Sequence, residues 1–254
     1  LRDTAILHFP FRLVFVSSAK KAAADSTAMA VDSNVVVLFD GTSLEGWRGY
    51  NKDTVPGAWV IEDGCIKING SGAGEAGARN GGDLIYAAEK FGNFELSFEW
   101  KVDKGSNSGV FYMIQEVPET PTYYSAPEYQ ILDNENHPDA KLGVDGNRTS
   151  ASLYDMIPAK PQNAKPYGEW NTGKIMVYKG TVVHYQNGEN VLEYHLWTPE
   201  WQAMLDKSKF SKDKNAKAYE LLTNCGGEQK EGYIGLQDHG DNVWYRNITV
   251  KKLD

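Results

Sequence analysis

Two short segments of the chain join a strand-forming pattern to side chains that could do chemistry. The first reads Glu-Tyr-Gln-Ile-Leu-Asp-Asn from Glu128, and the second is Gly-Leu-Gln-Asp-His-Gly, which contains Gln237 and His239. Alternate residues of a strand share a face, so Glu128 points the same way as Gln130, and Gln237 the same way as His239. Burying an unpaired polar group costs roughly 1–3 kcal/mol, so an apolar core would not hold these faces. The pattern predicts a wet groove that binds a ligand, and the simpler alternative is an exposed sheet face.

Further candidates lie on strands of their own. His184 leads into an Asn-Gly turn. A lone histidine on a strand is usually structural, so His184 is a strong candidate for the site only if it shares a face with Glu128. Arg246 lies on the last strand, where its cation could pair with a carboxylate or hold a sugar oxygen. Asn107 and Ser108 place small polar groups at the start of another strand.

Familiar catalytic and cofactor motifs are missing from the sequence, which has no Gly-x-Ser-x-Gly, His-Glu-x-x-His or Cys-His signature. Residues 72–77 match Gly-x-Gly-x-x-Gly, but the dinucleotide fingerprint must open a helix in a βαβ unit, and more loop follows here. The acidic loop at 133–137 lacks EF-hand spacing, so a solvated turn is the better prediction. Cys65 and Cys225 form no Cys-x-x-Cys pair, which argues against zinc. One disulfide would need them to meet in space.

Composition narrows the class of partner. The net charge is −8, and an acidic chain repels phosphate backbones, so we expect no nucleic-acid partner. No run is apolar enough to cross a bilayer, so we expect no membrane span. The chain has seven Trp and fourteen Tyr, which suits stacking on sugar rings and equally suits packing inside a β-sandwich.

The elements that must position these residues are short strands. Phe94 to Val102 alternates apolar and polar residues without fault, which predicts a strand with one buried and one wet face. Asn187-Gly188 is a strong hairpin signal between two further strands. Only one helix start is clear, at Thr198, and a second short helix could lie within 208–222. About ten strands with one or two inserted helices predict an all-β sandwich or jelly roll.

The beginning of the chain differs from the rest. Residues 1–30 read as a signal peptide, a pro-segment or a remnant of cloning, and we expect them to lie outside the fold. Residues 31–254 are predicted to form a single jelly-roll domain.

Several motifs together resemble the 3-keto-disaccharide hydrolase family, in chain order from about Val36 to Leu253. They are Leu-Phe-Asp-Gly-Thr-Ser-Leu-Glu-Gly-Trp from Leu38, Glu-Tyr-Gln-Ile-Leu-Asp from Glu128, Gly-Glu-Trp-Asn from Gly168, His184 before the Asn-Gly turn, and Gly-Leu-Gln-Asp-His-Gly with Arg246-Asn247-Ile248. The resemblance implies a concanavalin A-like jelly roll of two antiparallel sheets with a concave face for sugar. It also implies export to the periplasm or outer membrane of a Gram-negative bacterium. Tyr185-Gln186 depart from the family's usual Trp-Leu, which puts the local groove shape in question.

The activity implied by the resemblance is cleavage of glycosides oxidised to a ketone at C3. The ketone acidifies the hydrogen on C2, a base removes it, the enolate expels the C1 substituent, and water adds back. This needs a base, an acid for the leaving oxygen and a stabiliser of the enolate charge. A divalent cation held by Glu128 and a histidine would serve as the stabiliser, although the spacing does not demand one.

We assign roles on this basis. Glu128 and His184 divide the base and acid roles in an order left open. His239 and Arg246 stabilise charge or orient the substrate. Predicted sugar contacts are the polar residues Gln130, Asn107, Ser108 and Gln237 and the aromatic residues Trp47, Tyr112 and Trp170.

Two other functions remain open. A conventional glycosidase would use two carboxylates about 5–5.5 Å apart for retention or about 6.5–9.5 Å apart for inversion. The laminarinase pattern E-x-D-x-x-E is incomplete here, because Gln130 replaces the middle acid and Asp133 shortens the last one. A non-catalytic carbohydrate-binding module would need aromatic platforms without clustered titratable groups. Glu128, His184 and His239 on one concave face would favour the enzyme.

Overall fold

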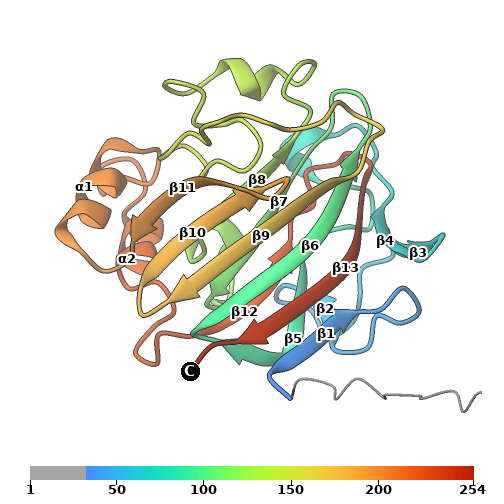
Figure 1. Cartoon of the computed structure of the whole chain (residues 1–254), viewed down its shortest axis with the longest axis horizontal. Helices are drawn as coiled ribbons and strands as arrows, with labels where there is room; N and C mark the ends of the chain where they lie inside the picture. Colours follow the sequence, from blue (N-terminus) through green and yellow to red (C-terminus); the bar gives the residue numbers. More distant parts are fainter. Residues whose placement is uncertain (1–32) are drawn as a thin grey trace, which may run out of the picture. The chain divides into compact units, whose positions relative to one another are not determined.

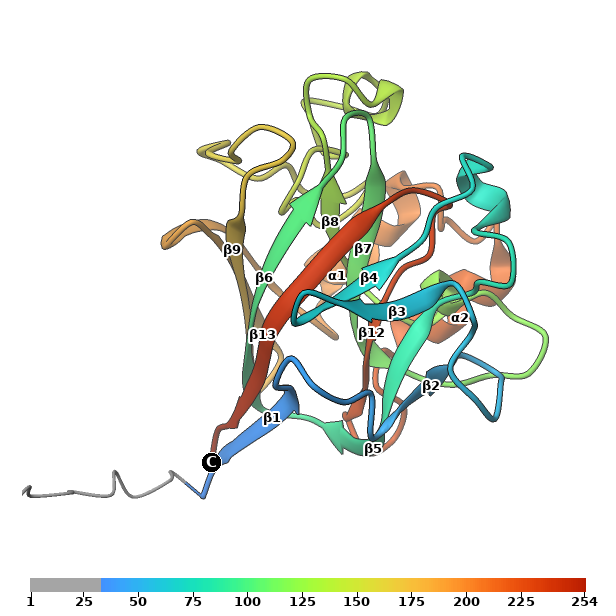
Figure 2. The same ribbon diagram turned by 90° about the vertical axis from the view of Figure 1, so that its right-hand side faces the viewer.

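The computed structural model describes residues 33–254, all of which lie in one unit of the chain. The expectation for residues 1–30 falls outside the described part of the chain. Within it, thirteen strands form two antiparallel sheets with two α-helices inserted, which confirms the predicted jelly roll (Figures 1 and 2).

The large sheet has eight strands. In spatial order they are β11 (Glu189–His195), β10 (Thr181–Gln186), β9 (Asn171–Tyr178), β6 (Phe94–Val102), β13 (Val243–Lys252), β4 (Cys65–Ile68) and β3 (Trp59–Glu62), with β1 (Val35–Phe39) also paired to β13. The predicted alternation of β6 is confirmed, because its five apolar residues are buried and its four polar ones are partly exposed. The Asn-Gly turn joins β10 to β11 as predicted.

The small sheet has five strands. Their order is β2 (Trp47–Gly49), β5 (Leu84–Phe91), β12 (Gly232–Leu236), β7 (Asn107–Ile114) and β8 (Glu128–Leu132). Every residue of β7 and β8 is buried, so this sheet is covered on both faces. Val110 and Tyr129 pack in the core between the sheets, whereas Phe111 and Ile85 join a second apolar cluster on the far face.

Two α-helices and three short 3-10 turns lie in the described segments that connect the strands. Helix α1 (Pro199–Lys207) begins as predicted, with the Thr198 hydroxyl accepting the N–H of Trp201 at 3.2 Å. Helix α2 (Ala216–Thr223) lies in the segment where a second helix was expected. Three short 3-10 turns are η1 (Gly74–Ala76), η2 (Thr122–Tyr124) and η3 (Pro138–Lys141). Cys65 and Cys225 are both buried and unpaired.

Candidate active site

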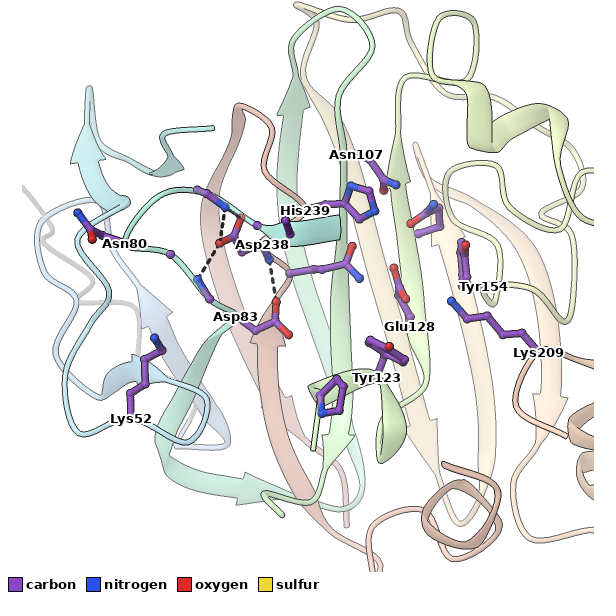
Figure 3. A pocket seen from close by; sticks show the side chains of 18 residues that line it. Lys52, Asn80, Asp83, Asn107, Tyr123, Glu128, Tyr154, Lys209, Asp238 and His239 are labelled. Carbon is purple, nitrogen blue, oxygen red and sulfur yellow. Dashed lines mark hydrogen bonds between the residues drawn. The ribbon is translucent and has the colours of Figure 1, made fainter. Parts of the chain in front are cut away.

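A pocket of about 560 Å³ lies on the face of the small sheet turned away from the core between the sheets. The two-residue period of a β-strand explains why the pocket lies on this face. Tyr129 and Ile131 of β8 pack in that core, so Glu128 and Gln130 must point to the opposite face, and both line the pocket. Figure 3 shows Glu128, Asp83 and His239 converging on this space from different segments. The volume is within the usual range for a small-molecule site.

Glu128 is the most perturbed acid of the pocket. Its side chain is only 6% exposed, and burial raises the pKa of its carboxyl to about 8. Gly109 of β7 makes room for it, because a Cβ there would lie 2.5 Å from Glu128 Oε1. With its amide oriented as the neighbours require, Gln130 donates to Glu128 Oε1 at 3.1 Å and to the Ser108 carbonyl at 2.9 Å. At neutral pH the carboxyl therefore keeps its proton and can act as a donor.

Asp83 supplies a second carboxyl to the same pocket. It precedes β5 and is partly exposed to the cavity. Surrounding protein atoms desolvate it enough to raise its pKa to about 6, and its Oδ1 accepts the N–H of Asp238 at 2.8 Å. At neutral pH Asp83 is therefore mostly ionised, whereas Glu128 is mostly protonated. The sequence prediction missed Asp83 because a single acid after two glycines carries no periodic signal.

Asp238 holds the rim of the pocket together. Its carboxylate accepts N–H bonds from Ala78 at 2.9 Å and Gly82 at 2.7 Å (Figure 3). It also accepts the N–H of Gly240 at 2.9 Å. Asp238 was part of a predicted motif, but it shares no face with Gln237 and His239 and received no role. The structure shows that it ties the 78–82 loop to the segment that carries His239.

Removal of this carboxylate should loosen the rim. Asp238→Ala leaves three backbone N–H groups without their acceptor, and a buried unpaired group costs roughly 1–3 kcal/mol. We expect a fall of several degrees in the melting temperature, because about 2–4 °C follows each kcal/mol in a domain of this size. Thermal unfolding followed by circular dichroism measures it. The exposed Asp213→Ala is the control, and equal melting temperatures for the two variants would contradict the role.

Three polar atoms of the pocket wall have no partner within the described residues. They are Asn107 Oδ1, Gln237 Oε1 and His239 Nδ1, and all three atoms are buried. Native proteins pair nearly all such atoms, so an unpaired group at a pocket marks a place for a ligand atom. Asn107 and Gln237 were predicted to contact substrate and His239 to stabilise charge or orient it in catalysis. The structure brings all three to one cavity with Glu128.

Lys209 brings positive charge to the pocket beside Glu128. Its Nζ lies 4.3 Å from the ring centre of Tyr154 and 5.2 Å from that of Tyr123, and all three residues line the cavity. Its backbone N–H donates to Asp155 Oδ2 at 2.8 Å, which fixes the segment after α1. Lys209 lowers the pKa of Glu128 against the larger effect of burial. The sequence prediction missed it because the segment showed only a solvated, charged pattern.

His184, in contrast, lies in the core between the sheets. It is fully buried, its Nε2 is 2.8 Å from the Tyr112 hydroxyl, and its Nδ1 is 2.9 Å from the Ala151 carbonyl oxygen. Burial lowers its pKa to about 4, so the ring is neutral. Tyr112 and Ser108 also point into this interior, Ser108 accepting the Tyr245 hydroxyl at 2.8 Å. We therefore revise the assignment of His184 as acid or base and of Tyr112 and Ser108 as sugar contacts.

Three other predicted residues lie away from the pocket. Arg246 forms an ion pair with Glu99 at 2.7 Å and stacks 3.9 Å from the ring centre of Trp170, on the solvent side of the large sheet. Trp47 is 5% exposed, and its indole N–H donates to the Leu38 carbonyl at 2.7 Å. These residues serve packing where they are, and the pocket's own aromatic residues are Tyr123 and Tyr154.

The departure at Tyr185-Gln186 also lies elsewhere. Gln186 is fully buried, and its amide donates to Gln162 at 2.7 Å and Asn163 at 3.1 Å. The polar residue thus anchors a loop outside the pocket.

Comparison with solved structures identifies the class of protein. A candidate glycosyl hydrolase from Parabacteroides distasonis ATCC 8503 matches with a TM-score of 0.70 and 26% identity, covering 87% of this chain and 94% of that one. A second structure so described from the same organism matches with a TM-score of 0.64 and 25% identity, covering 86% and 99%. With a jelly roll and an acid-lined pocket, the chain is a carbohydrate-active hydrolase.

The family follows from the sequence matches. The model of the 3-keto-alpha-glucoside-1,2-lyase-like domain matches residues 34–251, so the chain belongs to this family. A curated relative from Bacteroides thetaiotaomicron, named 3-keto-disaccharide hydrolase, is 64% identical over 250 residues, which are 94% of this chain and 86% of the relative.

Proposed function

We propose that the protein cleaves glycosides whose sugar ring carries a ketone at C3, by elimination across C1 and C2 followed by addition of water. The observation that carries the proposal is a pair of carboxyls in one sugar-sized pocket whose pKa values differ, about 6 for Asp83 and about 8 for Glu128. Such a pair supplies a base and an acid at the same pH. The name of the curated relative from B. thetaiotaomicron supports the choice of substrate.

Asp83 is the proposed base. It is ionised at neutral pH, and its Oδ1 is held by the Asp238 N–H. The C3 ketone makes the C2 hydrogen acidic, so a carboxylate of modestly raised pKa suffices to remove it. The C2–H pair of electrons forms the C1=C2 bond, and the bond from C1 to the leaving oxygen breaks.

Glu128 is the proposed acid. It holds a proton at neutral pH and gives it to the departing oxygen. The nearby charge of Lys209 stabilises the carboxylate that remains, since it favours the ionised form of Glu128. Water then adds across C1=C2, with its oxygen to C1 and a proton to C2, which yields a free 3-keto sugar.

The unpaired groups of the pocket wall would hold the sugar. Asn107 Oδ1 and Gln237 Oε1 are acceptors for ring hydroxyls, and Gln130 orients the Glu128 carboxyl. His239, which also lines the pocket, is the proposed partner of the C3 oxygen as enolate charge develops.

A matched pair of substrates tests the proposal. The pure protein is offered the same glycoside with and without a C3 ketone, in deuterated water. We expect cleavage only of the glycoside that carries the C3 ketone, with deuterium at C2 of the product. Glu128 and Asp83 are also two carboxyls in one pocket, and a conventional glycosidase using them would instead cleave the unoxidised sugar without C2 labelling. Binding without cleavage of either sugar would indicate a binding module.

The rate of cleavage should depend on pH as a bell. Activity requires Asp83 ionised and Glu128 protonated, so kcat/KM should rise as pH passes about 6 and fall as it passes about 8. Initial rates in buffers of constant ionic strength measure the profile. A flat profile between pH 5 and pH 9 would contradict the paired roles.

Cellular location belongs to the same proposal. The family resemblance favours an exported protein of the periplasm or outer membrane, which cell fractionation would test. In residues 33–254 no helix has the length and apolar character needed to cross a bilayer.

A further inference from the structure

Two histidines and a carboxylate gather at one edge of the pocket. One nitrogen of His137, one of His239 and a carboxylate oxygen of Asp241 all lie within 4.8 Å of one another. His239 and Asp241 follow β12 two residues apart, and His137 comes from the loop after β8, just before η3. All three side chains are partly exposed, so solvent ions can reach them.

The surroundings of this cluster point independently to a ligand. The backbone N–H of Asn107 donates to Asp241 Oδ2 at 3.0 Å, so Asn107 adjoins the cluster. Asn107 is 3% exposed, and its Oδ1 has no partner within the described residues. His239 Nδ1 is likewise buried and unpaired. Figure 3 shows Asn107 and His239 at the same end of the pocket. A cation beside the carboxylate would satisfy the amide oxygen of Asn107 and, in the tautomer with its proton on Nε2, Nδ1 of His239.

We propose that His137, His239 and Asp241 bind one divalent first-row transition ion at the pocket edge. Calcium and magnesium prefer sites built wholly of oxygen, whereas imidazole nitrogen suits zinc, cobalt and iron. Two histidines and one carboxylate leave coordination positions open to water or substrate, as in catalytic rather than structural metal sites.

His137 is the weakest of the three ligands. Its Nδ1 accepts the N–H of Asp139 at 3.1 Å, so in the neutral ring the proton sits on Nε2. Coordination requires a free lone pair, and the ring must therefore give up the Asp139 bond when the ion binds. His239 Nδ1 has no hydrogen bond to give up among the described residues, and the Asp241 carboxylate has a second oxygen besides the one that accepts the Asn107 N–H. Loss of His137 should thus weaken binding less than loss of either partner.

The use of the ion rests on the proposed function. A cation beside His239 would polarise the C3 ketone and stabilise the enolate that forms when Asp83 removes the C2 proton. This places the cation at C3 and the acid Glu128 at C1, on different parts of the ring.

Direct binding tests the site without any substrate. The full chain is stripped with a chelator, dialysed, and titrated with Co²⁺ and with Zn²⁺ by calorimetry, and the visible spectrum of bound Co²⁺ is recorded. We expect one equivalent to bind. Asp241→Asn, which keeps an acceptor for the Asn107 N–H, and His239→Ala should each weaken binding by at least roughly 10-fold. His137→Ala should weaken it by less.

The matched control is His195→Ala. His195 is an exposed histidine at the end of β11, close to Glu193, and its loss should leave the affinity unchanged. Thermal unfolding of each stripped variant shows that the fold is intact. Absence of saturable binding, or unaltered affinity in Asp241→Asn, would overturn the proposal.

Failure of this site and failure of the proposed function give different results. Binding of Co²⁺ that depends on His239 and Asp241, in a protein that cleaves no 3-keto glycoside, would reject the function and keep the site. Cleavage by the stripped protein with no metal binding would keep the function and reject the site.

Discussion

Glu128→Gln should lower turnover of a 3-keto glycoside with an alkyl leaving group by roughly 10²–10⁴-fold, the usual contribution of a general acid. The amide fills the same space but has no transferable acidic proton. A nitrophenyl leaving group needs little protonation, so its cleavage should fall much less. Steady-state kinetics on the two substrates measures the difference. The exposed Glu135→Gln is the control. Equal losses on both leaving groups would contradict the acid role and point to Glu128 as the base.

The same variant reports on the fold. Burial raises the pKa of Glu128 from 4.5 to about 8, so the folded protein keeps a proton that the unfolded chain releases in this range. The carboxyl's contribution to stability is therefore complete below about pH 4.5 and is lost as pH rises through about 8. Glu128→Gln cannot ionise, so it should melt above the wild type at pH 8, with the difference vanishing near pH 4. A lower melting temperature at pH 8 would show damage to the fold.

Asp83→Asn should sharply reduce both cleavage and the exchange of the C2 hydrogen with solvent. The asparagine keeps an oxygen for the Asp238 N–H but cannot take up a proton at neutral pH. We expect a loss of roughly 10²–10⁴-fold in turnover. Mass spectrometry of unreacted 3-keto glycoside recovered from deuterated water measures the exchange.

The two variants differ in one decisive respect. Glu128→Gln retains Asp83, so it should still exchange the C2 hydrogen of a substrate that it no longer cleaves. Asp83→Asn should do very little of either. If Asp83→Asn exchanged and Glu128→Gln did not, the base and acid roles would be reversed. The exposed Asp213→Asn should match the wild type in both measurements.

Local rules predicted the elements well. The alternation of Phe94–Val102, the Asn-Gly turn at Asn187 and the cap at Thr198 each depend on neighbours in sequence, and all are confirmed. The shared faces of Glu128 with Gln130, and of Gln237 with His239, also follow from the two-residue period, and all four residues line the pocket.

The same rules do not say which face of a strand is wet. His184 and Tyr112 have the residue types of a site, yet their faces close the core between the sheets, where they bond to each other. Ser108 alternates with Asn107 on β7, so only one of the two can reach the pocket. Strand order, set by pairing over long distances, makes that choice.

The amino-acid sequence by itself determined that the protein is all-β and that its strands carry a polar face, because side-chain alternation and turn chemistry act over a few residues. Only the tertiary structure brought Asp83, Lys209 and His137 to that face, since each lies in a loop whose position depends on distant contacts. The backbone N–H bonds of Gly82 to Asp238 and of Lys209 to Asp155 supply two of those contacts, and the His137 ring centre lies 6.0 Å from that of His239. The chemistry of the pocket depends on these loops as much as on its strands.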